Sequence, residues 1–225
     1  MDDKWKYIIE LIAKEKASVL CVQETKLVSL YASPCFSLWG SNDISWVHRG
    51  IACEGWGILT LCDNKVFKCD LSVKGKGFVL VVEDYKCGVS GPNVNVLIMN
   101  IYAPCSNKEK VLLWRKLEDK LANSNYLIRY MIGDFNSVTN VSERKEINKG
   151  TMNNYEIARF SEFIDRCTLK DIPLVGRKFT WYKPNGTTRN RLDRALVSDE
   201  WLMQWSGSKQ YMLSRQVCGH CALVV

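Results

Sequence analysis

The sequence has no apolar run that could cross a bilayer. Its longest aliphatic stretches, residues 78–82 and 96–99, fall far short of the roughly 20 residues that a membrane-spanning helix needs. No apolar segment follows the opening Met1-Asp2-Asp3, so we expect no secretory leader. Internal repeats, low-complexity tracts and linkers are also missing, and we therefore expect residues 1–225 to form a single domain.

The composition excludes disorder and argues against a secreted disulfide scaffold. A chain of 225 residues with 47% hydrophobic and 11% aromatic residues can bury a large core without covalent staples. The ten cysteines are scattered, which favours free thiols in a reducing, intracellular compartment, either nucleus or cytoplasm. With 31 basic and 24 acidic residues the net charge is +7, a mild excess that suits a polyanionic partner.

Hydrophobic periodicity predicts helices that alternate with short strands. Trp5, Ile8 and Ile12 share one helical face, and residues 18–22 are almost continuously apolar, as in a strand buried on both faces. Further strands are expected at residues 57–62, 66–73, 78–84, 94–101, 127–132, 179–182 and 191–197, and helices at 106–121, 154–167 and 199–205. A capping box from Ser106 to Glu109 would open the first of these helices. The pattern predicts an α/β or α+β fold with two sheets.

Polar side chains follow several of these strands directly, where loops leaving an α/β sheet form ligand crevices. They are Gln23, Glu24, Asn100, Tyr102, Asp134 and Asn136, joined by Asp193 and His220 in the last strands. Carboxylates, amides, a phenol and an Asp–His pair suit a hard, oxygen-ligated metal and phosphate chemistry. Each residue alone carries little weight, because a Gly-Asp after a strand is more often a turn.

Several motifs lie in an order and spacing that resembles a known family across nearly the whole chain. They are Leu20-Cys21-Val22-Gln23-Glu24-Thr25-Lys26, Gly57-Ile58-Leu59-Thr60-Leu61, Asn100-Ile101-Tyr102-Ala103-Pro104, Ile132-Gly133-Asp134-Phe135-Asn136, Gly176-Arg177-Lys178-Phe179-Thr180-Trp181, Arg191-Leu192-Asp193-Arg194-Ala195-Leu196-Val197-Ser198 and Cys218-Gly219-His220-Cys221-Ala222-Leu223-Val224. On these motifs the chain resembles the endonuclease/exonuclease/phosphatase superfamily. Within it, the chain is most similar to the endonuclease domain of plant LINE-type (non-LTR) retrotransposon polyproteins.

The resemblance implies a four-layer sandwich, in which helices flank two central mixed β-sheets, as in exonuclease III and pancreatic deoxyribonuclease. It also implies phosphodiester cleavage that depends on Mg²⁺, with Mn²⁺ as the alternative ion. Glu24 would bind the metal, and Asp134 would be a second contact to it. We expect these residues and the Asp–His pair to converge in one cleft.

The resemblance also implies roles for the remaining site residues. Asp134 would orient or deprotonate the attacking water, and Asn136 would hydrogen-bond that water or the phosphate. Tyr102 would contact a phosphate oxygen or the leaving group. His220 would donate to the phosphate as its charge rises, and Asp193 would hold the imidazole in the required tautomer.

Substrate contacts are expected from Asn100, Lys26, Arg191 and Trp181. Basic residues gather around the motif loops with aromatic residues between them, an arrangement that suits duplex DNA. Two alternatives remain open here: Trp181 packs in the core, or Asp193 forms an ion pair with Arg191 or Arg194. The sequence contains no feature that identifies a protein partner.

Cys218-Gly219-His220-Cys221 also matches the CxxC pattern of disulfide isomerases. That chemistry needs the first cysteine at a helix N-terminus, and only strand-like residues follow here. A zinc site built on the same cysteines lacks a second pair of ligands nearby. Both interpretations are therefore disfavoured.

Two departures from the family pattern bear on activity. Family members begin with a strand that ends in Trp-Asn, whereas this sequence opens on the first helix, so we expect that N-terminal strand to be missing. They also close on Ser-Asp-His, where this chain has Cys218, Gly219 and His220. Loss of groups around a metal typically costs 10–100-fold in affinity or activity.

Three functions remain open from the sequence. The first is a Mg²⁺-dependent DNA endonuclease of retrotransposon origin, degenerate in activity and without its reverse transcriptase domain. The second is a catalytically inactive remnant that at most binds nucleic acid. The third is a small-molecule or lipid phosphatase of the same fold.

Overall fold

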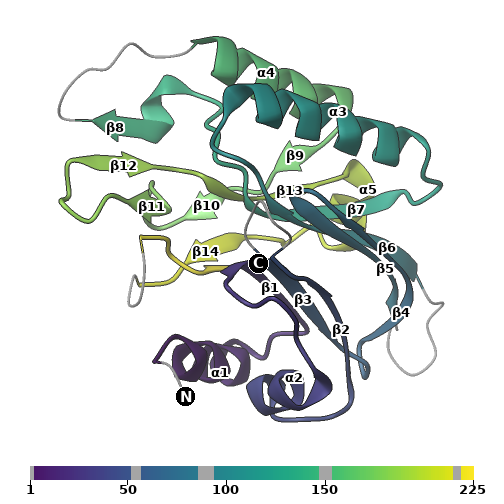
Figure 1. Ribbon diagram of the computed structural model, residues 1–225. Coiled ribbons are helices and arrows are strands. Elements are labelled where there is room, and N and C mark those ends of the chain that lie inside the picture. Colours follow the sequence, from purple (N-terminus) through teal and green to yellow (C-terminus); the bar gives the residue numbers. More distant parts are fainter. Residues whose placement is uncertain (1–2, 52–56, 86–93, 147–153, 215–218) are drawn as a thin grey trace. The chain divides into compact units, whose positions relative to one another are not determined.

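The computed structural model describes residues 3–51, 57–85, 94–146, 154–214 and 219–225 (Figure 1). These residues form two compact units, Met1–Tyr102 and Ala103–Val225. Helices and short strands alternate in both units, which confirms the predicted mixed α/β class.

The first unit contains two antiparallel three-stranded arrangements. Its elements are α1 (Asp3–Glu15), β1 (Val19–Thr25), α2 (Ala32–Trp39), β2 (Ile44–Arg49), β3 (Gly57–Asp63), β4 (Phe67–Gly75), β5 (Phe78–Tyr85) and β6 (Val94–Tyr102). One sheet has the order β1-β3-β2, and β4, β5 and β6 pair in sequence. Helices α1 and α2 cover one face of the β1-β3-β2 sheet (Figure 1).

The core under these helices contains Ile12 of α1, Leu38 of α2, and Leu59 and Leu61 of β3. Every residue of β3 except the last is buried, because β3 is the central strand. The expectation that residues 18–22 are buried on both faces is wrong: β1 lies at the edge of its sheet, and those residues are half-buried.

The second unit carries the remaining elements. They are α3 (Asn107–Ala122), β7 (Ile128–Asp134), the short 3₁₀ helix η1 (Val141–Glu143), β8 (Arg144–Glu146), α4 (Asn154–Arg166), β9 (Lys170–Asp171), β10 (Leu174–Val175), β11 (Trp181–Tyr182), β12 (Thr188–Asn190), β13 (Asp193–Val197), α5 (Asp199–Gln204), β14 (Gln210–Met212) and β15 (Leu223–Val224). Strand β13 pairs antiparallel with both β7 and β9. Two smaller sheets have the orders β11-β12-β8 and β10-β14-β15.

An aromatic cluster joins α3 and α4 to the end of β7. The Trp114 ring stacks on Phe163 with centroids 4.8 Å apart, and Phe160 lies 5.4 Å from Phe135, which directly follows β7. Leu113, Leu117 and Leu121 of α3 are buried. The predicted capping box is wrong, because Ser106 is the N-cap but its side chain makes no capping hydrogen bond.

A buried ion network ties β13 to η1 and β9. The Arg194 side chain is fully buried, and its guanidinium pairs with the carboxylates of Glu143 and Asp171. Burial alone would raise the pKa of Glu143, but hydrogen bonds from Arg194 and Thr139 and the charges of Arg194 and Arg191 lower it to about 2. The unit therefore contains a charged cluster that is compensated inside the protein rather than by water.

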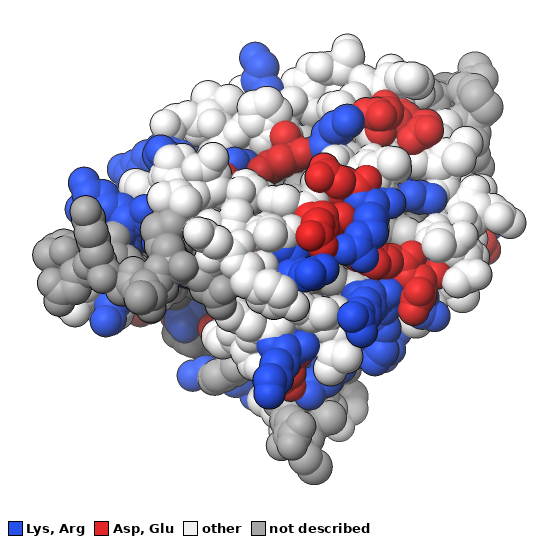
Figure 2. Space-filling model, turned by 90° about the horizontal axis from the view of Figure 1, so that it is seen from above, with Lys and Arg blue, Asp and Glu red and all other residues white. Residues whose placement is uncertain are grey.

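The face that includes α3 and α4 carries Lys and Arg side chains interleaved with Asp and Glu (Figure 2). Arg166 of α4 pairs with Glu162 at 2.8 Å and with Glu118 of α3 at 3.3 Å. Such exposed pairs contribute little to stability. Among the described residues, no helix is both long and apolar enough to span a membrane.

Glu143→Gln should destabilise the protein by about 3 kcal/mol at pH 7, because it leaves the buried Arg194 charge only partly compensated. The wild-type carboxyl has a pKa near 4.5 when unfolded and about 2 when folded. Its stabilisation is therefore complete above pH 4.5 and is lost as the pH falls towards 2. Urea unfolding across this pH range measures both effects.

The control is Glu162→Gln, which changes an exposed ion pair and should shift stability by less than about 0.5 kcal/mol. An identical acid dependence of stability in wild type and Glu143→Gln would contradict the assignment of the lowered pKa to Glu143.

Candidate functional site

His220 lies between two carboxylates of the second unit. Its Nδ1 is 3.0 Å and 3.1 Å from the two oxygens of Asp193, and its Nε2 is 3.8 Å from Oδ2 of Asp134. Because a carboxylate only accepts hydrogen bonds, Nδ1 carries the proton towards Asp193. The imidazole is therefore oriented by one carboxylate while its other nitrogen is directed at the second.

Strand pairing places the two carboxylates side by side. Asp134 ends β7 and is the register partner of Asp193, which begins β13. Both side chains are buried, and the backbone N–H groups of Leu192 and Asp193 each donate to Thr180 Oγ1 at 3.0 Å. Thr180 thus fixes the start of β13. This role for Thr180 was not predicted from the sequence.

Asn136 folds back onto Asp134. Its backbone N–H donates to Asp134 Oδ1 at 2.8 Å, and its side-chain amide donates to Oδ2 at 3.1 Å and to the Ala103 carbonyl at 2.7 Å. These bonds fix the orientation of the Asp134 carboxylate. Phe135, which lies between Asp134 and Asn136 in the sequence, is fully buried and anchors the turn.

Glu24 belongs to the first unit and sits at a β-bulge. The register of β1 against β3 shifts between Val22 and Thr25, and the exposed Glu24 side chain accepts a hydrogen bond from the Tyr102 hydroxyl at 2.8 Å. A Cβ on Gly57, the register partner of Thr25, would lie 2.1 Å from Thr25 Oγ1. The bulge therefore requires glycine at position 57.

Backbone strain marks the same two places. Among the described residues, four other than glycine have positive φ. Lys16 and Thr168 lie just beyond α1 and α4, where such angles are common. Glu24 at +58° lies inside β1 at its bulge, and Asn136 at +48° follows β7. Strain of this kind costs about 1–3 kcal/mol and gathers at functional sites.

Two of the residues expected to contact substrate are bonded to other residues of the protein. Asn100 is fully buried, where its amide accepts from Gln23 at 2.5 Å and donates to the Leu59 carbonyl at 2.9 Å. Arg191 is held by Glu143 at 3.1 Å and Asp171 at 2.7 Å. Substrate contact by either residue stays a prediction.

Among the described residues, Asp193 forms no ion pair with Arg191 or Arg194, so that interpretation is wrong. Both arginines bind Glu143 and Asp171, while the Asp193 carboxylate faces His220. Lys26 is exposed directly after β1.

Trp181 occupies the space beside Gly219. The two segments meet where Trp181 forms a β-bridge with His220, and the two rings lie 6.4 Å apart. A Cβ on Gly219 would lie 3.1 Å from the indole Nε1 and 3.2 Å from the Tyr182 carbonyl oxygen. Trp181 is half-buried, so its ring packs on the site while part of it remains accessible.

The CxxC interpretation gains no support. Cys218 lies outside the described residues, and Cys221 is buried just before β15 rather than at a helix N-terminus. The cysteines that the structure describes carry free thiols.

A basic ribbon is formed by β11, β12 and β8. Lys145 and Arg189 are register partners on neighbouring strands and are exposed, as is Lys183 just after β11. The Arg189 guanidinium lies 5.8 Å from the centre of the Tyr182 ring. The ribbon presents cations and an aromatic ring together.

The donor chemistry fits a divalent metal. One ligand atom each from Asp134, Asp193 and His220 lies within 4.8 Å of the others, and Glu24 offers an exposed carboxylate in the first unit. Carboxylate oxygens are the ligands that Mg²⁺ and Mn²⁺ prefer.

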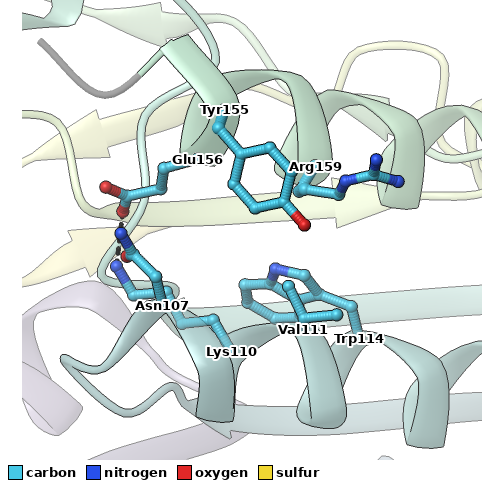
Figure 3. Close-up of a pocket in the computed structure, with 7 residues that line it drawn as sticks. All are labelled: Asn107, Lys110, Val111, Trp114, Tyr155, Glu156 and Arg159. Atoms are coloured by element: carbon cyan, nitrogen blue, oxygen red, sulfur yellow. Dashed lines mark hydrogen bonds and ion pairs between the residues drawn. The ribbon is translucent and has the colours of Figure 1, made fainter.

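A separate pocket between α3 and α4 (Figure 3) has a volume of about 10 Å³, room for about one water.

The fold and these residues identify the class of protein. Residues 5–210 match the sequence pattern of the Endonuclease/Exonuclease/phosphatase family, and the chain belongs to that family. Enzymes of this family are generally dependent on a divalent metal. No similar sequence was found among curated proteins.

Solved structures share the fold at low sequence identity. The AP endonuclease LMAP from Leishmania major is 18% identical with a TM-score of 0.70, over 96% of this chain and 80% of that one. A variant of the 3′ phosphatase NExo from Neisseria, bound to a product DNA hairpin, is 14% identical with a TM-score of 0.71, over 98% and 92%. Truncated TDP2 from Caenorhabditis elegans is 15% identical with a TM-score of 0.60, over 98% and 88%.

Gly219→Ala should destabilise the protein by about 1–3 kcal/mol, because the new methyl group meets Trp181 and the Tyr182 carbonyl. In a Trp181→Phe background the loss should shrink, since the indole nitrogen is gone, yet persist in part because the carbonyl remains. Thermal unfolding of the four proteins in this cycle measures the coupling. Gly207→Ala is the matched control, because a Cβ there meets nothing within 4 Å; equal losses at both glycines would refute the steric account.

Proposed function

We propose that the protein is a divalent-metal-dependent phosphodiesterase that nicks DNA at a low rate, and that Mg²⁺ is its ion. The observation that carries this proposal is the imidazole of His220 held between Asp193 and Asp134. We also propose descent from a LINE-type retrotransposon endonuclease, which rests on the sequence motifs alone.

In the second unit each residue has a distinct task. Asp134, whose carboxylate is positioned by the N–H groups of Asn136, accepts a proton from the attacking water. His220 donates from Nε2 to a phosphate oxygen as negative charge develops, and Asp193 stabilises the imidazolium. Water attacks phosphorus and the bond from phosphorus to the 3′ oxygen breaks; the departing oxygen takes a proton from solvent, which leaves a 3′-hydroxyl end and a 5′-phosphate end.

In the first unit Glu24 is the metal ligand and Tyr102 orients it. The phenol donates to Oε1, so the second oxygen, Oε2, can face the ion. When bound, Mg²⁺ supplies positive charge to a phosphate that is already anionic.

Gly219 is the reason to expect a low rate. A carboxylate at this position would lie next to His220, but glycine supplies no ligand and Trp181 fills the adjoining space. This contact is also the observation that favours the second candidate, an inactive remnant that retains nucleic-acid binding.

Supercoiled plasmid should be nicked in the presence of Mg²⁺ and remain intact with EDTA. His220→Ala and Asp134→Asn should each lower the rate by about 10²–10⁴-fold, because each removes a group that acts on the reacting atoms. Gel assays with a matched Asp119→Asn control, an exposed carboxylate on α3, measure the effect.

Other results would separate the alternatives. Nicking that survives His220→Ala would sink the proposed mechanism. DNA binding without nicking, with activity gained in Gly219→Asp/Trp181→Phe, would identify an inactive remnant. Turnover of a small phosphomonoester but not of plasmid would identify a phosphatase.

We propose the β11-β12-β8 ribbon as the DNA contact. Lys145→Ala, Lys183→Ala and Arg189→Ala should each weaken binding equally across DNA sequences and reduce the slope of log K against log salt by about 1. Fluorescence anisotropy at several salt concentrations measures the slope. Lys120→Ala, on the exposed side of α3, should leave it unchanged, and an equal reduction there would argue against a localised contact.

A further inference from the structure

Lys110 is a charged residue on the buried side of α3. It shares one helical face with Leu113, Trp114 and Leu117, all of them buried, and it is itself only 5% exposed. An ammonium group removed from water is costly unless partners compensate its charge. Its position therefore calls for a specific role.

Two partners receive the ammonium group. Lys110 Nζ donates to the backbone carbonyl of Asn136 at 2.5 Å and forms an ion pair with Glu156 of α4. Figure 3 shows the side chains of Lys110 and Glu156 directed at each other between the two helices. Ser137, the next residue in the turn, donates its hydroxyl to the same Glu156 carboxylate at 3.3 Å.

These bonds act on the strained turn that follows β7. Asn136 has a φ of +48°, and its N–H and side-chain amide both donate to Asp134. The carbonyl of the same residue is held on the opposite side by Lys110. The Lys110–Glu156 pair thus hydrogen-bonds to the turn at Asn136 and Ser137, and the turn itself hydrogen-bonds to Asp134.

We infer that Lys110 and Glu156 are positioning residues for the Asp134 carboxylate, acting through Asn136 without touching substrate. This inference rests on the proposed function for its catalytic consequence. The geometric consequence, a fixed Asn136 turn, does not depend on it.

The competing explanation is that the pair only joins α3 to α4. Lys110→Met removes the cation from the largely buried Glu156 carboxylate, so this variant loses stability under either explanation. Lys110→Met/Glu156→Gln removes both charges and should recover most of the melting temperature. If the pair is only structural, activity recovers together with stability.

The test compares wild type, the two single variants, the double variant and Lys116→Met, an exposed lysine of α3, as the control. In the double variant kcat should stay about 10–100-fold low with KM unchanged, because Asn136 has lost its clamp while substrate contacts remain. Hydrogen exchange of the Asn136 amide should become roughly tenfold faster, while amides within β7 keep their protection.

The two readouts separate the possible failures. If wild type does not nick DNA, the proposed function fails and amide exchange alone decides the inference. If the double variant has normal exchange at Asn136, or regains full kcat with its stability, the positioning role is overturned.

Discussion

The second unit depends on one fully buried guanidinium. Arg194 binds carboxylates from η1 and β9, and it lies in β13 between Asp193 and Ala195. Successive side chains of a strand point to opposite faces, so the charge network holds one face of β13 while Asp193 projects from the other. The orientation of His220 by Asp193 therefore rests on charge compensation behind the strand.

Much of the fold could be predicted because periodic patterns are local. The apolar face of α1, the buried leucines of α3 and the largely apolar strands β3 and β5 all signal their structure directly. The short helix α2 and strand β2 were missed. Pro34 lies within the first turn of α2, where it is tolerated, but in sequence it resembles a helix breaker. The edge position of β1 is a property of the sheet and leaves no trace in its own residues.

The same distinction between local and long-range features applies to the candidate site. The neighbouring positions of Asp134, Asp193 and His220 agree with what strand ends and family resemblance predict, although their roles stay a proposal. Burial of Asn100 and the pairing of Arg191 could not be predicted, because their partners lie far away in sequence. The Lys110–Glu156 pair is of the same kind, since only the packing of α3 on α4 brings it together.

Gly57 has a consequence for how this protein tolerates mutation. Any Cβ there would come within 2.1 Å of Thr25 Oγ1, so even alanine must displace β1 or β3. The strained backbone at Glu24, which lies inside the bulge between Val22 and Thr25, would relax with it. A single missense change at Gly57, which carries no functional group, would thus displace the Glu24 carboxylate although residue 24 itself is unchanged. Genetic drift at structural glycines can end an activity before any functional codon changes.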